Sequence, residues 1–276
     1  MAEQHAAFVG TVPPKYDRYL GPLLFHPYAD DLVARLPVAH GMRVLEIACG
    51  TGIVTERLLR RLAGQGTLVA TDLNDAMIAH ARTRIPDDPA LEWRQADGTS
   101  LPFPDRAFDV AVCEFGLMFF PDKAKGVREA FRVLRPGGLY LFNVWDSLDQ
   151  TPVCRITHET VGTFFPVDPP QFYTVPFSLH DTSGVRRLLD TAGFVDVTCV
   201  TLDKVGQSPS AADAATGLID GNAIYEAIMA RRPGSLADIK AAVARNVASE
   251  LGDHPVRSPL RAHVFSARRP AGSPLD

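Results

Sequence analysis

The stretch Val44-Leu-Glu-Ile-Ala-Cys-Gly-Thr-Gly52 decides the fold. It is a short apolar run that enters a turn containing two glycines, and from Val54 to Leu62 apolar residues then recur at helical spacing. This pattern predicts a strand, a tight loop and a helix. A doubly wound sheet binds its ligand just outside the carboxyl end of such a strand. The loop is therefore a candidate ligand site.

The same alternation continues along the chain. We expect further strands at residues 67–71, 91–94, 108–113, 138–144, 194–201 and 262–267, and helices at 76–83, 123–134 and 182–192. Residues 136–138 are expected to separate the second of these helices from the strand that follows. Most of the strands are nearly continuous apolar runs, which is typical of parallel strands covered on both faces. The sequence predicts an α/β protein with a doubly wound, mostly parallel seven-stranded sheet, Rossmann-like, whose last strand is antiparallel at the sheet edge.

The remaining segments suggest a lid over this sheet. We expect residues 1–40 to form an N-terminal helical lid segment and residues 41–276 to form the main domain. Insertions at about 146–180 and 206–255 would form a substrate cap. The first is rich in proline and aromatic residues and is expected to be partly irregular, whereas residues 210–251 are mostly helical and suit a lid or a homodimer surface equally well.

Composition narrows the classes of partner. The 276 residues are 46% hydrophobic and 22% charged, enough to bury a full core. Twenty-eight Lys and Arg against 32 Asp and Glu leave a net charge of −4, so nucleic acid or a membrane surface is not an expected partner. No run of apolar residues is long enough to span a membrane. The four scattered cysteines suit neither a disulfide framework nor a zinc site, and we expect a cytoplasmic protein without a metal.

Three acidic residues stand at the ends of three successive strands: Glu46, Asp72 and Asp97. Glu46 would repel a diphosphate and suits a cation or an ammonium group, and Thr55 stands where a dinucleotide loop would carry its third glycine. Asp72 is placed to accept both hydroxyls of a ribose, and Asp97 to accept from an exocyclic amine such as that of adenine. Each acid alone suits a turn or a cap. Together they predict a site for an adenosine-containing cofactor.

Four segments carry a resemblance to a known family. They are Val44–Gly52, Ala96–Asp109, Phe131–Gly138 and Leu188–Phe194. The sequence resembles the class I S-adenosylmethionine-dependent methyltransferases over roughly residues 16–268, and among them the ubiquinone and menaquinone biosynthesis C-methyltransferases. The resemblance implies that residues 41–276 are a methyltransferase domain with S-adenosyl-L-methionine as its cofactor.

The same resemblance implies which residues bind that cofactor. By portion of the cofactor, they are Glu46, Ala48, Gly50 and Gly52 for the methionine end, Asp72 for the ribose, Leu73 and Met77 for the adenine pocket, Asp97 and Gly98 for the adenine amine, and Glu114 and Phe115 for the far side. Ala48 departs from the family, since many members have glycine there.

Aromatic residues suggest the kind of methyl acceptor. They gather in residues 16–28, 115–120 and 164–173, and if these segments meet over the sheet they form an apolar chamber. We therefore expect in-line methyl transfer to a small hydrophobic or aromatic molecule. His180 is the candidate catalytic base, ahead of His158 and Asp146.

Two other functions stay open. One is a protein that keeps the cofactor bound without transferring methyl, such as a rearrangement catalyst or a binding module. The other is an NAD-dependent oxidoreductase, against which Thr55 and Glu46 count. The atom that receives the methyl group and the oligomeric state are not determined by the sequence.

Overall fold

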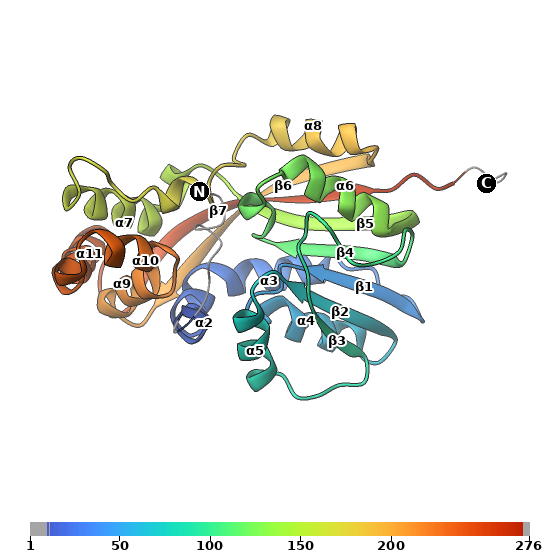
Figure 1. Ribbon diagram of the computed structural model, residues 1–276, viewed down its shortest axis with the longest axis horizontal. Helices are drawn as coiled ribbons and strands as arrows, with labels where there is room; N and C mark the ends of the chain where they lie inside the picture. The colour runs from blue at the N-terminus through green and yellow to red at the C-terminus, as the bar shows by residue number, and fades with distance from the viewer. Residues whose placement is uncertain (1–9, 11, 273–276) are drawn as a thin grey trace.

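A seven-stranded sheet forms the centre of the molecule in the computed structural model, which describes residue 10 and residues 12–272. The strands are β1 Met42–Ile47, β2 Gly66–Asp72, β3 Leu91–Gln95, β4 Phe108–Glu114, β5 Leu134–Trp145, β6 Val195–Ser208 and β7 Val256–Arg268. Their order is β3-β2-β1-β4-β5-β7-β6 (Figure 1), and β1 to β5 pair in parallel. The predicted fold class is confirmed. Among the described residues, no helix is both long and apolar enough to cross a bilayer.

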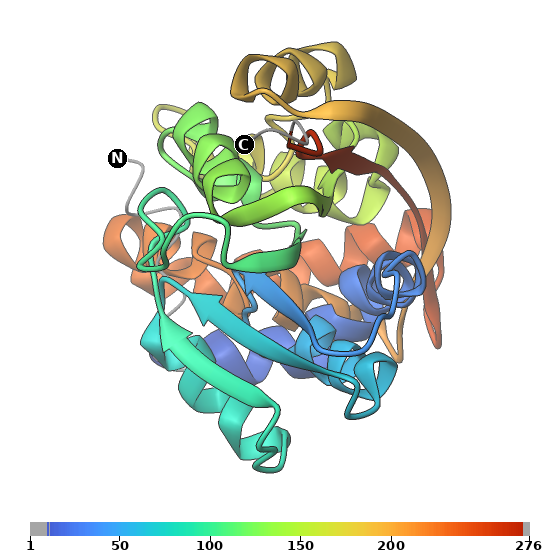
Figure 2. The ribbon, with the colours of Figure 1, turned by 90° about the vertical axis from the view of Figure 1, so that its right-hand side faces the viewer.

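The predicted position of the last strand was wrong. β7 is antiparallel, as expected, but it lies between β5 and β6, and β6 forms the edge (Figure 2). Val264 and Phe265, whose side chains point to opposite faces, are both buried in β7, whereas Val200 and Val205 of β6 are 40% and 53% exposed. A strand that is apolar on both faces is stable in the sheet interior, and a strand with exposed side chains suits the edge.

Helices cover both faces of the sheet. They are α4 Ile53–Leu62 and α5 Asp75–Arg84 on one side, and α6 Lys123–Val133 and α8 Thr182–Ala192 on the other (Figures 1 and 2). Gly193 ends α8 in the left-handed conformation, as its position predicted. Residues 136–138 do not separate α6 from the next strand. They lie within β5, where the pairing with β4 shifts register between Phe108 and Val110.

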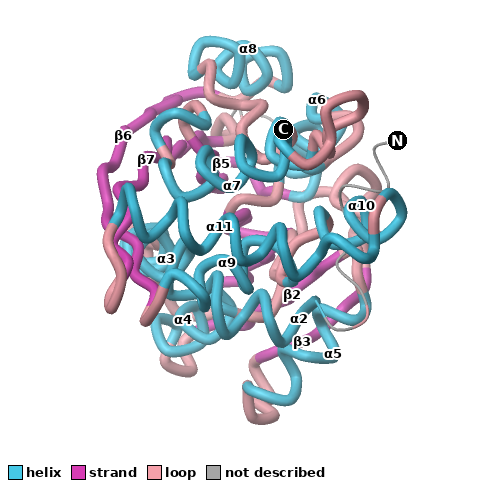
Figure 3. Tube along the Cα trace, turned by 90° about the vertical axis from the view of Figure 1, so that its left-hand side faces the viewer, coloured by secondary structure: helices cyan, strands magenta, loops and turns pink. Residues whose placement is uncertain are grey.

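Most of the remaining helices gather at one end of the molecule (Figures 1 and 3), whereas the helix of residues 26–34 packs against α4. The N-terminal segment contains α2 Val12–Lys15, the π-helix η1 Tyr16–Phe25 and α3 His26–Ala34. The cap, defined here as residues 148–177 and 211–251, contains α7 Pro152–Thr163, α9 Ala211–Asp220, α10 Ile224–Arg231 and α11 Leu236–Leu251. Helix α7 was not expected, because Pro152 suggested a break. In the structure this proline occupies the first turn of α7, where a missing N–H costs nothing.

The N-terminal segment is fastened to the cap through α9. A Cβ added to Gly217 would lie 2.6 Å from Tyr19 Cβ, so the absence of a side chain lets η1 approach α9 closely. Buried Asp220, at the end of α9, pairs with Lys15 Nζ at 3.1 Å and with Lys240 Nζ at 2.7 Å. These contacts fix the start of η1, and with it Tyr16, against the cap.

Candidate cofactor and acceptor sites

The loop after β1 is held in an unusual backbone conformation. Ala48, Gly50 and Gly52 all have positive φ, at 59°, 54° and 84°. A Cβ on Gly52 would lie 2.7 Å from Ile85 Cδ1, so only glycine fits there without a shift. Ala48, where many family members have glycine, adopts the left-handed conformation at a cost of about 1–2 kcal/mol. Alanine in place of glycine at position 48 therefore leaves the conformation of the loop unchanged.

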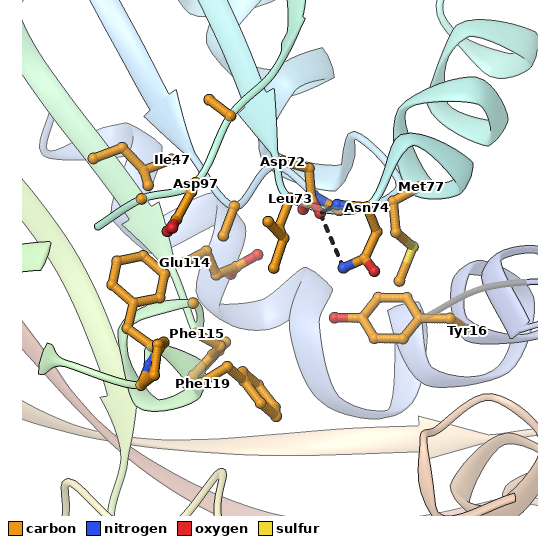
Figure 4. A pocket seen from close by; sticks show the side chains of 17 residues that line it. Tyr16, Ile47, Asp72, Leu73, Asn74, Met77, Asp97, Glu114, Phe115 and Phe119 are labelled. Atoms are coloured by element: carbon orange, nitrogen blue, oxygen red, sulfur yellow. Dashed lines mark hydrogen bonds between the residues drawn. The ribbon is translucent and has the colours of Figure 1, made fainter. Parts of the chain in front are cut away.

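Asp72 connects this loop to the end of β2. Its Oδ2 accepts a hydrogen bond from the backbone N–H of Gly50 at 2.8 Å, and its Oδ1 accepts one from the N–H of Asn74 at 2.8 Å. Burial raises the pKa of Asp72, while these hydrogen bonds oppose the rise. Oδ1 also accepts from the side-chain amide of Asn74 at 3.4 Å, whereas Oδ2 has a second lone pair with which it can accept from a ligand. Figure 4 shows Asp72 beside Asn74 at the wall of a cavity.

That cavity, which we call the crevice, follows the carboxyl ends of β1 to β4 (Figure 4). Nine of the eleven residues proposed for the cofactor line it: Ala48, Gly50, Asp72, Leu73, Met77, Asp97, Gly98, Glu114 and Phe115. Of the other two, Gly52 is the residue just before α4 and does not line the crevice, and Glu46 lines a small cavity beside it. The structure thus brings the residues on successive strand ends to one place.

Asp97 and Gly98 shape the far wall of the crevice. Asp97 Oδ1 accepts from the N–H of Thr99 at 2.7 Å and from its hydroxyl at 2.8 Å, which fixes the turn after β3. A side chain on Gly98 would collide with the ring of Phe120, another lining residue. Gly98 therefore allows Phe120 to close the crevice.

Glu46 has a partner that the sequence did not reveal. The hydroxyl of Thr55 donates a hydrogen bond of 2.6 Å to Glu46 Oε2, and both residues are buried. Burial, aided by the nearby Asp72, raises the pKa of Glu46 to about 8. Thr55 is thus more than a departure from the dinucleotide motif, since it orients the acid that precedes the glycine loop.

A second cavity, the aromatic chamber, adjoins the crevice. Its lining comes from the N-terminal segment, the loop after β4, the end of β5 and the cap: Tyr16, Leu24, Phe25, Phe115, Phe119, Trp145, Cys154, Phe172, Tyr173, Pro176, Phe177 and Asn222. The three aromatic segments of the sequence therefore do meet. None of these lining residues is Lys, Arg, His, Asp or Glu, so the chamber suits an uncharged molecule.

Three aromatic residues form the boundary between the two cavities. Tyr16, Phe115 and Phe119 line both. The ring of Phe115 stacks on that of Trp145, with centroids 3.9 Å apart, which gives the chamber a rigid wall. Sequence reasoning missed Trp145, Asn74 and Asn222 as lining residues. Trp145 ends β5 at the same edge of the sheet as the three acids, which was the available signal.

The structure does not bring His180 to either cavity. The side chain of His180 is exposed, and its Nδ1 lies 2.9 Å from the carbonyl oxygen of Phe177, so this nitrogen acts as the donor. Phe177 points into the chamber instead. His158 and Asp146 line neither cavity. Within residues 12–272, no group of three or more His, Cys, Asp or Glu is arranged to hold a metal ion.

Comparison with known proteins agrees with this geometry. Residues 45–142 match the family model of a methyltransferase domain. The ubiquinone/menaquinone biosynthesis C-methyltransferase UbiE of Serratia proteamaculans is 31% identical over 178 residues, which cover 60% of this chain and 71% of that protein. UbiE of Idiomarina loihiensis is 43% identical over 107 residues, or 38% of this chain and 43% of that protein. This chain therefore matches less than half the length of the second relative.

A solved structure has the same fold. Phosphoethanolamine N-methyltransferase 2 of Haemonchus contortus, in complex with S-adenosyl-L-methionine, superposes with a TM-score of 0.60 at 16% identity, covering 93% of this chain and 56% of that one. The sheet order and the matched domain define a Rossmann-like methyltransferase. The chain belongs to the class I S-adenosylmethionine-dependent methyltransferases and is similar to the UbiE C-methyltransferases.

Proposed function

We propose that this chain transfers a methyl group from S-adenosylmethionine to a small, uncharged aromatic acceptor. The observation that carries the proposal is the shared wall of Tyr16, Phe115 and Phe119, with an acid-lined crevice on one side and an uncharged aromatic chamber on the other. Such an arrangement would place a cofactor and an apolar acceptor on either side of one boundary.

The crevice fits the chemistry of the cofactor. Asp72 is held by its hydrogen bonds to Gly50 and Asn74, and its Oδ2 has a lone pair left to accept from a ribose hydroxyl. Asp97 would accept from the adenine amine, with Met77 and Leu73 beside the ring. Glu46 and the backbone of residues 48–52 would hold the methionine end. Glu114 Oε1 is buried without a hydrogen-bond partner, which is consistent with a polar ligand in the adjacent space.

The cofactor supplies an electrophilic methyl group and its own leaving group. The protein has to align the acceptor with that methyl group and keep water away. The stacked pair Phe115 and Trp145 would orient a flat ring, and Tyr16 and Phe119 would limit its position at the boundary. The names of the relatives refer to quinone biosynthesis, and a phenol or quinol would suit the uncharged chamber.

The chamber has to widen to admit such an acceptor. Its volume is about 40 Å³, whereas an apolar cavity of about 150 Å³ holds one benzene molecule. Tyr16 and Phe25 belong to the N-terminal segment, and Tyr173 and Asn222 belong to or follow helices of the cap. Movement of the N-terminal segment relative to the cap would therefore open the chamber.

Two measurements test the function. In a thermal-shift assay, S-adenosylhomocysteine should raise the melting temperature and NAD should not, because a ligand that binds only the native state stabilises it. Labelled methyl should then appear on a phenol or quinol in a panel that also contains amines. Stabilisation by NAD alone would refute the proposal. Binding of S-adenosylhomocysteine without transfer to any panel member would favour a protein that retains the cofactor for another purpose.

A further inference from the structure

Most ionisable side chains around the two cavities already have their polar atoms engaged. Asp72 and Asp97 accept from backbone N–H groups, and Glu46 accepts from Thr55. On the chamber side, the hydroxyl of Tyr173 donates to the carbonyl oxygen of Leu218 at 2.8 Å. These groups are held in structural hydrogen bonds that a proton transfer would disturb.

Glu114 differs from them. It ends β4, lines both the crevice and the small cavity beside Glu46, and its Oε1 is buried with no hydrogen-bond partner. A buried carboxyl oxygen without a partner costs free energy, and such groups gather at functional sites. In Figure 4 the carboxyl end of Glu114 and the hydroxyl of Tyr16 point toward one another across the crevice.

The backbone around Glu114 is held in place. The next residue, Phe115, has a φ of 47°, a left-handed conformation that is uncommon for a bulky residue. Its N–H donates to Asn143 Oδ1 at 2.9 Å, and its ring is stacked on Trp145. Strained backbone of this kind persists where the surrounding structure enforces it, often at active sites. Glu114 itself lines the crevice and not the chamber, and it is fixed next to Phe115, which lines both cavities. An acceptor at the boundary between the cavities would therefore be within its reach.

The surroundings of Glu114 favour its protonated form. Burial is the largest cause that raises its pKa, and the carboxylates of Glu46 and Asp30 add to the rise. Arg57 and the side chain of Asn143 act in the opposite direction. The pKa therefore lies well above its ordinary value. Once ionised, a carboxylate of this kind is a stronger base than an exposed one.

We propose that Glu114 is the general base that accepts the hydroxyl proton of the acceptor. This inference rests on the proposed function and narrows it, because it requires an acceptor with an aromatic hydroxyl group. The O–H bond breaks, its electron pair stays on the oxygen, and the proton moves to the Glu114 carboxylate. For carbon methylation, a C–C bond forms from the ring as the bond between sulfur and methyl breaks. The methylated ring carbon then loses its proton to solvent, and the oxygen regains a proton from Glu114, which restores the carboxylate. One proton is released overall.

The test compares Glu114→Gln with the wild type. The acceptor is the phenol or quinol that gives the highest turnover in the panel. We expect kcat to fall by about 10²–10⁴-fold, the typical contribution of general base catalysis. In the wild type, log kcat should rise with pH up to a plateau above the pKa of Glu114, and the variant should lose that rise. Because Glu114 also lines the crevice, the Kd for S-adenosylhomocysteine measured by calorimetry should change, but far less than kcat does, and a cooperative melting transition would show that the variant folds.

Asp109→Asn is the matched control. Asp109 belongs to the same strand as Glu114 and is partly buried, but it pairs with Arg135 at the other end of β4 and lines neither cavity. We expect its kcat and pH profile to match the wild type. Glu114→Asp, which keeps the carboxyl group, should recover part of the activity lost in Glu114→Gln.

Three results would overturn the inference. One is an unchanged kcat and pH profile in Glu114→Gln. Another is a large rise in the Kd for S-adenosylhomocysteine with kcat unaffected at saturation, since Glu114 would then serve to bind the cofactor. The third is methyl transfer to amines and to no hydroxylated acceptor. That result would contradict the role of Glu114 but would still agree with a methyltransferase. Failure of the wild type to bind S-adenosylhomocysteine would instead refute the proposed function itself.

Discussion

Thr55 donates a hydrogen bond of 2.6 Å to the carboxyl group of Glu46, nine residues earlier in the chain. The bond joins the end of β1 to the first turn of α4 across the glycine loop. Both side chains are buried, so neither group has water as an alternative partner. This bond therefore stabilises the loop and sets the orientation of the acid.

Thr55→Val should lower the free energy of unfolding by about 1–3 kcal/mol, because it leaves a buried carboxyl without its donor. Urea denaturation would measure the change. Thr216→Val is the matched control, since the half-buried Thr216 donates only to the carbonyl oxygen of Ala212 within its own helix. Its effect should stay within about 0.5 kcal/mol. Equal losses in both variants would show that the bond to Glu46 has no special importance.

The stability of the ligand-free protein should fall as pH rises. The pKa of Glu46 is about 8 in the folded protein, against an ordinary value of 4.5. Between these values the folded state retains a proton that the unfolded state has lost, so the free energy of unfolding declines with pH across this window. Asp72 and Glu114 act in the same direction, since their pKa values are also raised. Glu46→Gln should reduce the decline in a series of urea titrations. An identical slope in the variant would argue against the raised pKa.

Asp72→Ala should raise the Kd for S-adenosylhomocysteine by at least tenfold. It removes the proposed ribose contact and the two hydrogen bonds that fix residues 50 and 74. Asp168→Ala is the control, because that exposed side chain pairs only with Arg231. Calorimetry would show the difference, and similar Kd values for the two variants would remove the assignment of Asp72.

Gly98→Ala should also weaken cofactor binding, by about tenfold, because its methyl group would displace the ring of Phe120 from the crevice wall. At Gly162 an added Cβ meets nothing within 4 Å, so Gly162→Ala serves as a control that leaves the Kd unchanged. Calorimetry with S-adenosylhomocysteine gives both values. If Gly98→Ala bound as tightly as the wild type, Phe120 would have no part in closing the crevice.

Asp220→Asn should loosen the N-terminal segment. It weakens the ion pairs with Lys15 and Lys240 and should cost about 1–3 kcal/mol of stability. Trypsin should cleave after Lys15 faster than in the wild type. Asp203→Asn breaks only an exposed pair with Arg261, so its cleavage rate should not change. Equal cleavage in all three proteins would mean that Asp220 does not hold the segment closed.

The arrangement of the crevice followed from the sequence because topology determines it. In parallel strands the carboxyl ends share one edge of the sheet, so acids at residues 46, 72 and 97 had to lie near each other. The loop glycines could also be predicted, because they follow the first strand directly and precede a helical pattern. The partner of Glu46 was not, because the bond to Thr55 depends on how the helix after the loop is rotated.

Contacts between segments far apart in the chain could not be predicted from the sequence. The order of β6 and β7 depends on which of the two is buried on both faces, a difference that is clear only once the strands are seen at full length. In the same segment Phe177 lines the chamber and His180 is exposed, and the sequence does not reveal which of the two side chains packs inward. Asn222 reaches the chamber only through the packing of the cap.

A crystal structure with S-adenosylhomocysteine tests the central claim most directly. The adenosine ribose should lie against the carboxyl group of Asp72, the adenine amine should face Asp97, and the amino-acid end should reach the cavity beside Glu46. Its sulfur should point toward the wall formed by Tyr16, Phe115 and Phe119. Density for the ligand outside the crevice, or none at saturating concentration, would contradict the account.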